Sequence, residues 1–337
     1  MSKTVVIALG GNAIMAGGSA GTAQEQIENV CATCRHIADM IEKGYQLVIT
    51  HGNGPQVGNI LIQNEEASSL VPPMPLDICG AQTQGMIGYM IQCCLANELR
   101  LRGLDRPVVT VVTQVVVRPD DPALHHPTKP VGPFYPVEKA QNLKKEKGYT
   151  LKEINHRGWR RVVPSPEPIR VYEGEALRNL VRNGMVVIAC GGGGIPVCFD
   201  SRGLLQGVEA VIDKDLAGEK LAVEVGADFF VILTDVEKVA INFKKTNQRF
   251  LDRLTVAEAR RYLEEGHFPP GTMGPKVEAA VRFIEEGGEM AVITSLEKAG
   301  EALDGEAGTV IEAGRPNQGL PTTPRGFLER PLAPTPR

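Results

Sequence analysis

The sequence predicts an α/β protein that contains an inserted subdomain. Short aliphatic runs such as Thr4–Leu9 and Phe229–Leu233 alternate with longer helix-like stretches, which is the pattern of strands connected by helices. Two of the early runs end in Gly/Asn loops that open helices. Nine prolines fall between Arg118 and Arg170, and an insertion of this kind indicates a small subdomain or lid. At 337 residues the chain can form about two domains or one large α/β unit.

The composition favours a small-molecule partner. The 36 basic and 40 acidic residues nearly balance, which argues against bulk binding of nucleic acid. No apolar run reaches the ~18 residues of a membrane span, and Met1–Thr4 passes directly into a strand-like run instead of a signal peptide. We therefore expect a cytoplasmic protein with no membrane contact. Its seven cysteines are expected to be free thiols, and the Cys31/Cys34 pair lacks the second pair that a zinc site needs.

The first half of the chain contains two candidate anion loops. Gly10-Gly11-Asn12 follows the first strand, and His51–Gly58 follows a strand at Leu47–Thr50. Each loop alone is weak evidence, because Gly-Asn turns are common. Together, on successive strands, they predict one anion held between them by backbone N–H groups. The other expected elements are helices at 22–43, from Pro55, and at 78–102 with Asp77 as cap, and strands at 108–112 and 115–117.

The second half contains a loop of four glycines, Gly191–Gly194, after a helix at 174–183 and a strand at 186–189. A backbone this bare must lie against a ligand or a neighbouring element. It fits neither a Walker nor a Rossmann motif, so any phosphate is handled by another device. Thr255–Glu258 is a capping box that starts a short helix, two strands are expected at 290–294 and 309–311, and 315–337 is expected to be a tail without a catalytic part.

The segment Gly207–Ala217 places a lysine between two aspartates at a strand-to-helix junction. Ala217, Leu221 and Val225 predict a helix that ends at Gly226, with Asp215 as its N-cap. A functional site and a solvated charged turn are both open for these residues alone.

Two further lysines stand at comparable turns. Lys129 lies in a Pro-rich stretch, and Lys276 lies in the first turn of a helix expected at 277–286. A lysine at a helix N-terminus is electrostatically unfavourable unless an anion sits there. Three lysines beside three glycine loops are what phosphoryl transfer needs, because it requires N–H groups for anions and fixed positive charge over the transferring group.

Taken together, these motifs resemble those of the carbamate kinases of the amino acid kinase superfamily. The resemblance covers residues 1 to about 312 and depends on motifs in the family's order: Gly10–Asn12, Thr50–Gly58, Lys129–Tyr135, Arg160–Pro166, Gly191–Val197, Gly207–Ala217 and Met273–Lys276. It implies a three-layer α/β/α sandwich on a mainly parallel open sheet with a protruding subdomain. It also implies a homodimer that converts ATP and carbamate reversibly into ADP and carbamoyl phosphate with Mg²⁺.

The resemblance also assigns roles by position. Lys129, Lys214, Asp215 and Lys276 are the expected catalytic residues, with Asp215 orienting the lysines and no metal ligand set in the protein. The expected substrate-binding residues are Gly10, Gly11, Asn12, Gly52, Asn53 and Gly54. The expected nucleotide-binding residues are Asp213, Asp235, Asn242, Met273, Gly274 and Pro275. His51 is expected to orient its loop, and Lys244 stands where the family usually has glycine.

The same assignment divides the chain into four parts. Residues 1–117 and 166–205 form the carbamate and carbamoyl phosphate lobe, 118–165 the lid subdomain, 206–314 the nucleotide lobe, and 315–337 the tail. Two other functions stay open from sequence: another carboxylate kinase of the superfamily, and a non-catalytic sensor of carbamoyl phosphate or nucleotide that kept the fold.

Overall fold

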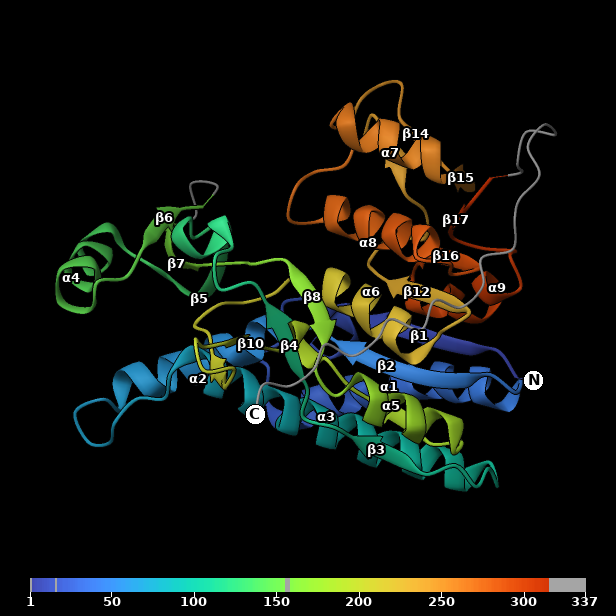
Figure 1. Ribbon diagram of the computed structural model, residues 1–337, viewed down its shortest axis with the longest axis horizontal. Coiled ribbons are helices and arrows are strands. Elements are labelled where there is room, and N and C mark those ends of the chain that lie inside the picture. Colours follow the sequence, from blue (N-terminus) through green and yellow to red (C-terminus); the bar gives the residue numbers. More distant parts are fainter. Residues whose placement is uncertain (1, 16, 155–157, 315–337) are drawn as a thin grey trace.

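The computed structural model describes residues 2–15, 17–154 and 158–314, so the expected tail lies outside the described residues. Its centre is an eight-stranded sheet in the order β15-β17-β16-β12-β1-β2-β9-β3 (Figure 1). Neighbouring strands are parallel except for β16 and β17. The strands are β1 (Thr4–Leu9), β2 (Gln46–His51), β3 (Val108–Thr110), β9 (Val186–Ile188), β12 (Phe229–Leu233), β15 (Arg253–Thr255), β16 (Met290–Thr294) and β17 (Thr309–Glu312).

Helices cover both faces of this sheet, as side-chain alternation along β1 shows. Val5, Ile7 and Leu9 point into a core formed with α1 (Ala23–Glu42), α3 (Leu76–Leu101) and α9 (Ala299–Leu303). Val6 and Ala8 point to the opposite face, which is covered by α5 (Gly174–Arg182), α6 (Lys214–Val225), α7 (Val256–Glu264) and α8 (Met273–Glu285). The predicted α/β/α sandwich is therefore confirmed.

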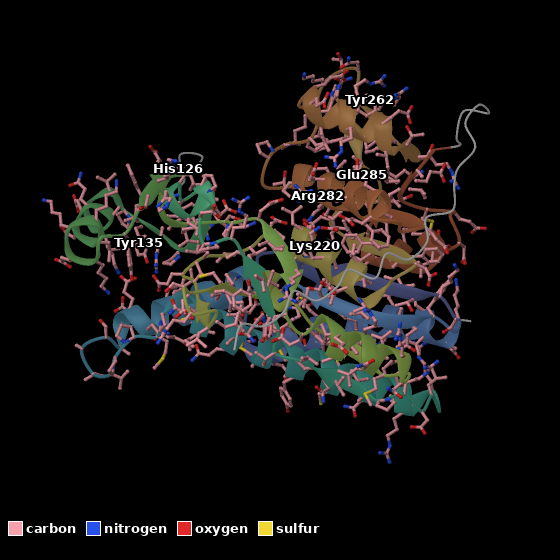
Figure 2. All side chains as sticks on the ribbon, in the orientation of Figure 1. His126, Tyr135, Lys220, Tyr262, Arg282 and Glu285 are labelled. Carbon is pink, nitrogen blue, oxygen red and sulfur yellow. A yellow bond between two sulfur atoms is a disulfide. The ribbon has the colours of Figure 1, made fainter. Side chains whose placement is uncertain are left out.

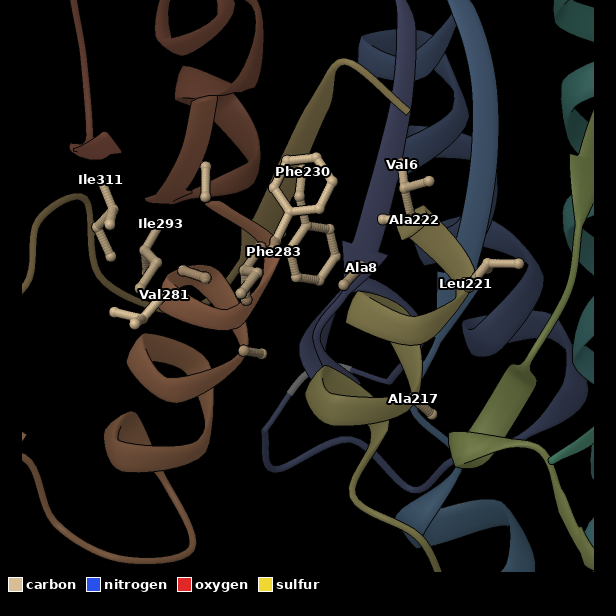
Figure 3. Close-up of a cluster of buried hydrophobic side chains, with 14 of the residues drawn as sticks. Val6, Ala8, Ala217, Leu221, Ala222, Phe230, Val281, Phe283, Ile293 and Ile311 are labelled. Atoms are coloured by element: carbon tan, nitrogen blue, oxygen red, sulfur yellow. The ribbon is translucent and has the colours of Figure 1, made fainter. Parts of the chain in front are cut away.

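The second of these cores fixes α6 and α8 over the middle of the sheet. Figure 3 shows Ala222 of α6 beside Val6 of β1, and Phe230 of β12 next to Phe283 of α8. The two phenyl centroids are 5.7 Å apart. Each ring is worth a few kcal/mol of buried apolar surface, about 2 kcal/mol or more. This packing fixes the two helices side by side, and the Asp215–Lys276 ion pair joins their N-terminal ends.

Local sequence signals explain most helix ends. The Thr22–Glu25 and Thr255–Glu258 capping boxes start α1 and α7, and Gly226 ends α6 in the left-handed conformation with φ 70°. Asp77 is not the cap of α3, because Pro75 occupies that position and Asp77 lies in the first turn. There its carboxylate still complements the positive helix N-terminus.

Two smaller sheets adjoin the centre. One has the order β11-β10-β4-β8, and the other, β5-β7-β6, projects to one side with α4 (Figure 1). Their strands are β4 (Gln114–Val117), β5 (Lys129–Tyr135), β6 (Leu151–Glu153), β7 (Trp159–Val163), β8 (Pro168–Val171), β10 (Ile195–Phe199) and β11 (Leu205–Gly207). The remaining elements are α2 (Gly54–Glu66), α4 (Val137–Lys147), a hairpin of β13 (Ala240–Ile241) and β14 (Arg249–Phe250), and 3₁₀ turns at Gly11–Ala13, Pro122–His125, Gly191–Gly193 and Leu296–Lys298.

The projecting sheet is joined to the body by polar contacts. Tyr135, labelled at the left of Figure 2, donates from its hydroxyl to Glu65 of α2 at 2.8 Å. Arg161 of β7 lies 3.7 Å from Glu209 in the segment before α6. Gly58 of α2 packs against the backbone of Gly132, where a Cβ would stand 3.6 Å from its Cα. Strand β5 is therefore set against α2.

The prediction of seven free thiols is wrong for two cysteines. Cys31 of α1 and Cys94 of α3 form a disulfide, while Cys34, Cys79, Cys93, Cys190 and Cys198 are free. The sequence could not show this pair, because the two cysteines are separated by 63 positions and meet only when the two helices pack. Among residues 2–15, 17–154 and 158–314, no helix combines the length and apolar character that a membrane crossing requires.

Candidate active site

The site is organised by the start of α6. Asp213 is the N-cap, and its Oδ1 accepts the N–H of Asp215 at 2.9 Å. The prediction that Asp215 caps the helix is therefore wrong by two residues, because Lys214 and Asp215 already have helical geometry. This shift turns the Asp215 side chain away from the cap and leaves both of its oxygens free for other partners.

Asp215 holds two ammonium groups. Its Oδ1 lies 2.5 Å from Lys214 Nζ, its Oδ2 lies 2.8 Å from Lys276 Nζ, and only 4% of its side chain is exposed. Burial by itself would raise the pKa of Asp215, but the two lysines outweigh it and lower the pKa to about 2. Burial in turn lowers the pKa of Lys214, against the attraction of Asp215. The result is a buried anion between two cations, which leaves one net positive charge.

Helix α8 begins at Met273, four residues earlier than predicted, and Lys276 still lies in its first turns. Pro275 falls at the third helical position, where its missing N–H leaves no hydrogen bond unmade. The cation near the helix N-terminus is offset by Asp215. A negative side chain thus performs part of the role for which the sequence suggested a bound anion.

The third lysine arrives from the projecting sheet. Lys129, the first residue of β5, donates to Asp213 Oδ2 at 2.7 Å. All three lysines line one cavity of about 350 Å³. Its wall consists of Gly10, Gly11, Asn12, Lys129, Asp213, Lys214, Asp215, Thr234, Asp235, Gly271, Thr272 and Lys276. Residues 147 positions apart in the chain are thereby brought to one chamber.

A second cavity, of about 270 Å³, adjoins the lysine chamber. Both share Gly11, Lys129 and Lys214. The second cavity also includes the predicted substrate residues Gly52, Asn53 and Gly54. At Gly52 an added Cβ would stand 3.5 Å from Lys214 Cδ, so the lysine stem lies along bare backbone.

A third cavity, of about 190 Å³, opens on the other side of the lysine chamber. It shares Thr234, Asp235, Thr272 and Lys276 with the chamber, and its walls add Phe243, Phe250 and Met273. The sequence did not single out Phe243 or Phe250 as site residues. Phe243 could have been found, since it directly follows Asn242, but Phe250 reaches the cavity only through the β13–β14 hairpin.

The predicted nucleotide residues divide between the cavities. Met273 lines the apolar cavity, and Asp235 lies where it meets the chamber. Asp213 lies in the lysine chamber instead, and Asn242, Gly274 and Pro275 line none of the three cavities. Asn242 shapes the adjoining loop, with φ 53° and a long contact to the Asn247 carbonyl at 3.4 Å. Asn12 and Asp235 are joined by a 2.7 Å hydrogen bond.

The four-glycine loop lies against a neighbouring element. A Cβ at Gly191 would stand 2.3 Å from His51 Nε2, and one at Gly192 would stand 2.2 Å from Asn53 Nδ2. The loop thus packs against the loop that carries the predicted substrate residues, and Gly192 also lines the second cavity. His51 is buried, and its burial is the main reason that its pKa is lowered to about 4. The hydrogen bond to the Gly52 carbonyl opposes this effect, and the charge of Lys214 adds to it. A neutral buried imidazole fits a loop-orienting residue.

Known proteins resemble this chain over nearly its whole length. The model of the amino acid kinase family matches residues 3–295. The chain is 55% identical to a carbamate kinase of Pyrococcus furiosus and 57% identical to one of Thermococcus kodakarensis, and each match covers 92% of this chain and 99% of the relative.

Solved structures of carbamate kinases also resemble this chain. A carbamate kinase of Giardia lamblia bound to AMP-PNP superimposes with a TM-score of 0.87 at 44% identity, over 92% of this chain and 98% of that one. The chain belongs to the amino acid kinase family.

Proposed function

We propose that this protein is a carbamate kinase, which transfers a phosphoryl group reversibly between ATP and carbamate to give ADP and carbamoyl phosphate. The observation that carries the proposal is the chamber in which Lys129, Lys214 and Lys276 meet around Asp213 and Asp215. The identity of 55% and 57% to carbamate kinases across 99% of their length supports this acceptor over an amino-acid carboxylate.

The lysines supply the charge that the transfer needs. Lys214 and Lys276 face the transferring phosphoryl group, and Asp215 keeps both ammonium groups in place when no ligand is bound. A lysine about 4 Å from a phosphate oxygen contributes up to roughly 4 kcal/mol at an effective dielectric near 20, before desolvation. Carbamate already carries an oxyanion, so its attack on phosphorus requires no general base.

The substrates occupy opposite ends of the chamber. The carbamoyl end lies on the backbone of Gly10, Gly11 and Asn12 and on Gly52–Gly54, with Lys129 above it. The nucleotide base lies in the cavity of Phe243, Phe250 and Met273, whose rings and thioether suit a flat aromatic ligand. Asn242, Gly274 and Pro275 shape that cavity from outside through the β13–β14 loop and the start of α8.

Mg²⁺ fits this site as a companion of the nucleotide. Across the part of the chain that the structure describes, no three His, Cys, Asp or Glu side chains come together in a way that could hold a metal ion. Both oxygens of Asp215 are taken by lysines, which leaves Asp235 as the carboxylate at the nucleotide side. Mg²⁺ usually keeps several waters and binds through substrate phosphates plus one or two carboxylates. When bound, it would neutralise phosphate charge.

Different segments of the chain supply the two substrate-binding sides and the lid. Residues 1–117 and 166–205 supply the carbamoyl side, 206–314 the nucleotide side, and 118–165 carries Lys129 as a lid. The ion pair of Lys129 with Asp213 supports the last assignment, because it joins the projecting sheet to the start of α6.

We also propose that the protein acts as a homodimer. The outer face of α3 exposes Tyr89 (68%) and Leu101 (84%), which are large apolar side chains that a partner copy would cover. Light scattering after size exclusion should give about twice the chain mass of 36.3 kDa. A mass of one chain at micromolar concentration would contradict the dimer.

The test of function is ATP formation from ADP and carbamoyl phosphate. The protein should form ATP with Mg²⁺ present, and it should not phosphorylate N-acetylglutamate or aspartate. No ATP from carbamoyl phosphate would reject the proposal and favour the sensor, while phosphorylation of an amino-acid carboxylate would favour the rival kinase.

Lys214→Met is the matched negative control for that assay. It keeps an unbranched apolar stem along Gly52 and removes the ammonium, while Lys276 still neutralises Asp215. We expect turnover to fall about 100- to 1000-fold, with circular dichroism unchanged. Turnover near that of the original protein would remove Lys214 from the proposed mechanism.

A further inference from the structure

The disulfide between Cys31 and Cys94 joins two helices of one layer. Cys31 lies in the middle of α1 and Cys94 in the second half of α3, and their Cα atoms are 5.0 Å apart. Both helices contribute to the same buried core, through Val30 and Ile37 of α1 and Ile91 and Leu95 of α3. The bond therefore adds a covalent link to helices that already pack together.

The segment closed by this bond includes the predicted substrate residues Gly52, Asn53 and Gly54, whereas Gly10, Gly11 and Asn12 lie outside it. Between the two cysteines lie β2, the loop His51–Asn53 and the whole of α2. None of the residues assigned to the nucleotide side is in this interval. A covalent link here therefore constrains the segment that carries Gly52–Gly54 and includes no residue of the nucleotide side.

We propose that Cys31–Cys94 is a reversible thiol–disulfide site that stabilises the substrate-binding half of the protein when it is oxidised. The site takes a dithiol of the thioredoxin type, or a small thiol, as its reductant, and the corresponding disulfide as its oxidant. It is independent of the proposed phosphoryl transfer.

The burial of the cysteines sets the order of the chemistry. Cys31 is partly exposed, whereas Cys94 is 6% exposed, so a thiolate of the reductant attacks Cys31 Sγ. A mixed disulfide forms at Cys31, and Cys94 leaves as a thiolate that takes up a proton. The reductant's second thiolate then attacks its own sulfur in the mixed disulfide. This step releases Cys31 as a thiol and leaves the reductant oxidised by two electrons.

The neighbouring thiol of Cys34 does not complete this exchange within the chain. Cys34 lies one helical turn from Cys31, but burial raises its pKa to about 12, so it is not a thiolate at neutral pH. Its Sγ also contacts the Ile91 carbonyl at 3.8 Å. Cys93 is exposed and adjacent to Cys94, and it provides a matched control because it shares the helix but not the bond.

The expected effect is on stability. Closing a loop of this length reduces the freedom of the unfolded chain, and the reduced protein still folds because the α1–α3 core is intact. We expect reduction to lower the melting temperature by about 5 °C. Amide hydrogen exchange should rise in β2, the following loop and α2 more than in α6 and α8.

The experiment uses the full chain after incubation with oxidised or reduced glutathione. Alkylation and peptide mass mapping should find the Cys31 and Cys94 peptides joined in the oxidised sample and separately alkylated in the reduced one. Dithiothreitol should lower the melting temperature of the oxidised original protein and of Cys93→Ser equally. Cys94→Ser should melt like the reduced protein and show no response.

Three results would overturn the proposal. They are separate Cys31 and Cys94 peptides after oxidation, an unchanged melting temperature on reduction of a bond shown by mass, and loss of the response in Cys93→Ser. Because reduction is measured on the original protein, a Cys94→Ser chain that fails to fold does not remove the test.

Discussion

Asp213 performs two tasks with one carboxylate. Its Oδ1 caps α6, which fixes the backbone of Lys214 and Asp215, and its Oδ2 holds Lys129. The residue that starts the helix is therefore also the anchor of the lysine from the projecting sheet. The sequence predicted a nucleotide role for Asp213 but not these two partners, because the spacing of a motif does not reveal which way a side chain turns.

Substitution of Asp213 can separate these tasks. Asparagine is as good an N-cap as aspartate, so Asp213→Asn should keep the melting temperature nearly unchanged while the Lys129 ammonium loses its anionic partner. We expect turnover to fall about tenfold through loss of positioning. Asp213→Ala should in addition lose about 1 kcal/mol of stability. Steady-state kinetics and thermal melts measure the two effects, and equal destabilisation by both variants would contradict the division.

We expect His51 to make the stability of the folded protein decrease in mild acid. Its pKa in the folded protein is lowered to about 4, so the unfolded chain binds the proton first as pH falls. The stability contributed by the neutral imidazole is full above the unfolded pKa of about 6.5 and is lost as pH falls toward 4. The lowering of the His51 pKa on folding corresponds to about 3 kcal/mol of the free energy of unfolding.

We expect the difference to be visible in a variant. His51→Asn keeps a donor near the Gly52 carbonyl but has no group that titrates in this range. Its melting temperature should start lower at pH 7.5, because the ring no longer packs on Gly191. It should then fall less between pH 7.5 and pH 5. A parallel fall in both proteins would mean that other groups set the acid response.

The four-glycine loop packs closely against the loop at His51–Asn53 because it has no side chains. Gly192 has φ 67°, and an added Cβ would collide with Asn53 Nδ2. Gly192→Ala should therefore displace the substrate loop and raise the KM for carbamoyl phosphate about tenfold or more, while the KM for ADP stays the same.

Gly203→Ala provides the control for backbone strain. Gly203 also has positive φ, at 77°, but nothing lies within 4 Å of an added Cβ. Both variants should lose about 1 kcal/mol of stability from the left-handed conformation, and only Gly192→Ala should change the KM. An equal change in both would attribute the effect to strain alone.

Elements with strong local signals were predictable. The bounds of β1, β12 and β16 agree with the sequence prediction, because each is a short aliphatic run between clear breaks. The Thr255–Glu258 capping-box start and the Gly226 stop were also predicted from local chemistry. The strands β8, β10 and β11 were not predicted, since each has three to five residues without alternation and is defined by its partners.

In the candidate site, too, contacts between distant segments could not be predicted from the sequence. The sequence singled out the three lysines and the glycine loops as groups that phosphoryl transfer would require, and the structure brings the lysines to one chamber. The ion pair of Lys129 with Asp213, the place of Phe250 and the Cys31–Cys94 bond all join segments that are far apart in the chain. Only the packed sheet and its two helical layers bring these residues together.

Strand β17 is needed for the fold of the whole molecule, whereas we expect residues 315–337 to be dispensable. Strand β17 lies between β15 and β16, and Val310 and Ile311 are buried there. Removing residues 315–337 leaves this strand intact, so ATP formation and the melting temperature should stay near those of the full chain. Removing 309–337 opens the sheet and takes away two core side chains worth roughly 4 kcal/mol. That shorter chain should fail to fold, while loss of activity on removing 315–337 alone would make the tail part of the enzyme or of its dimer.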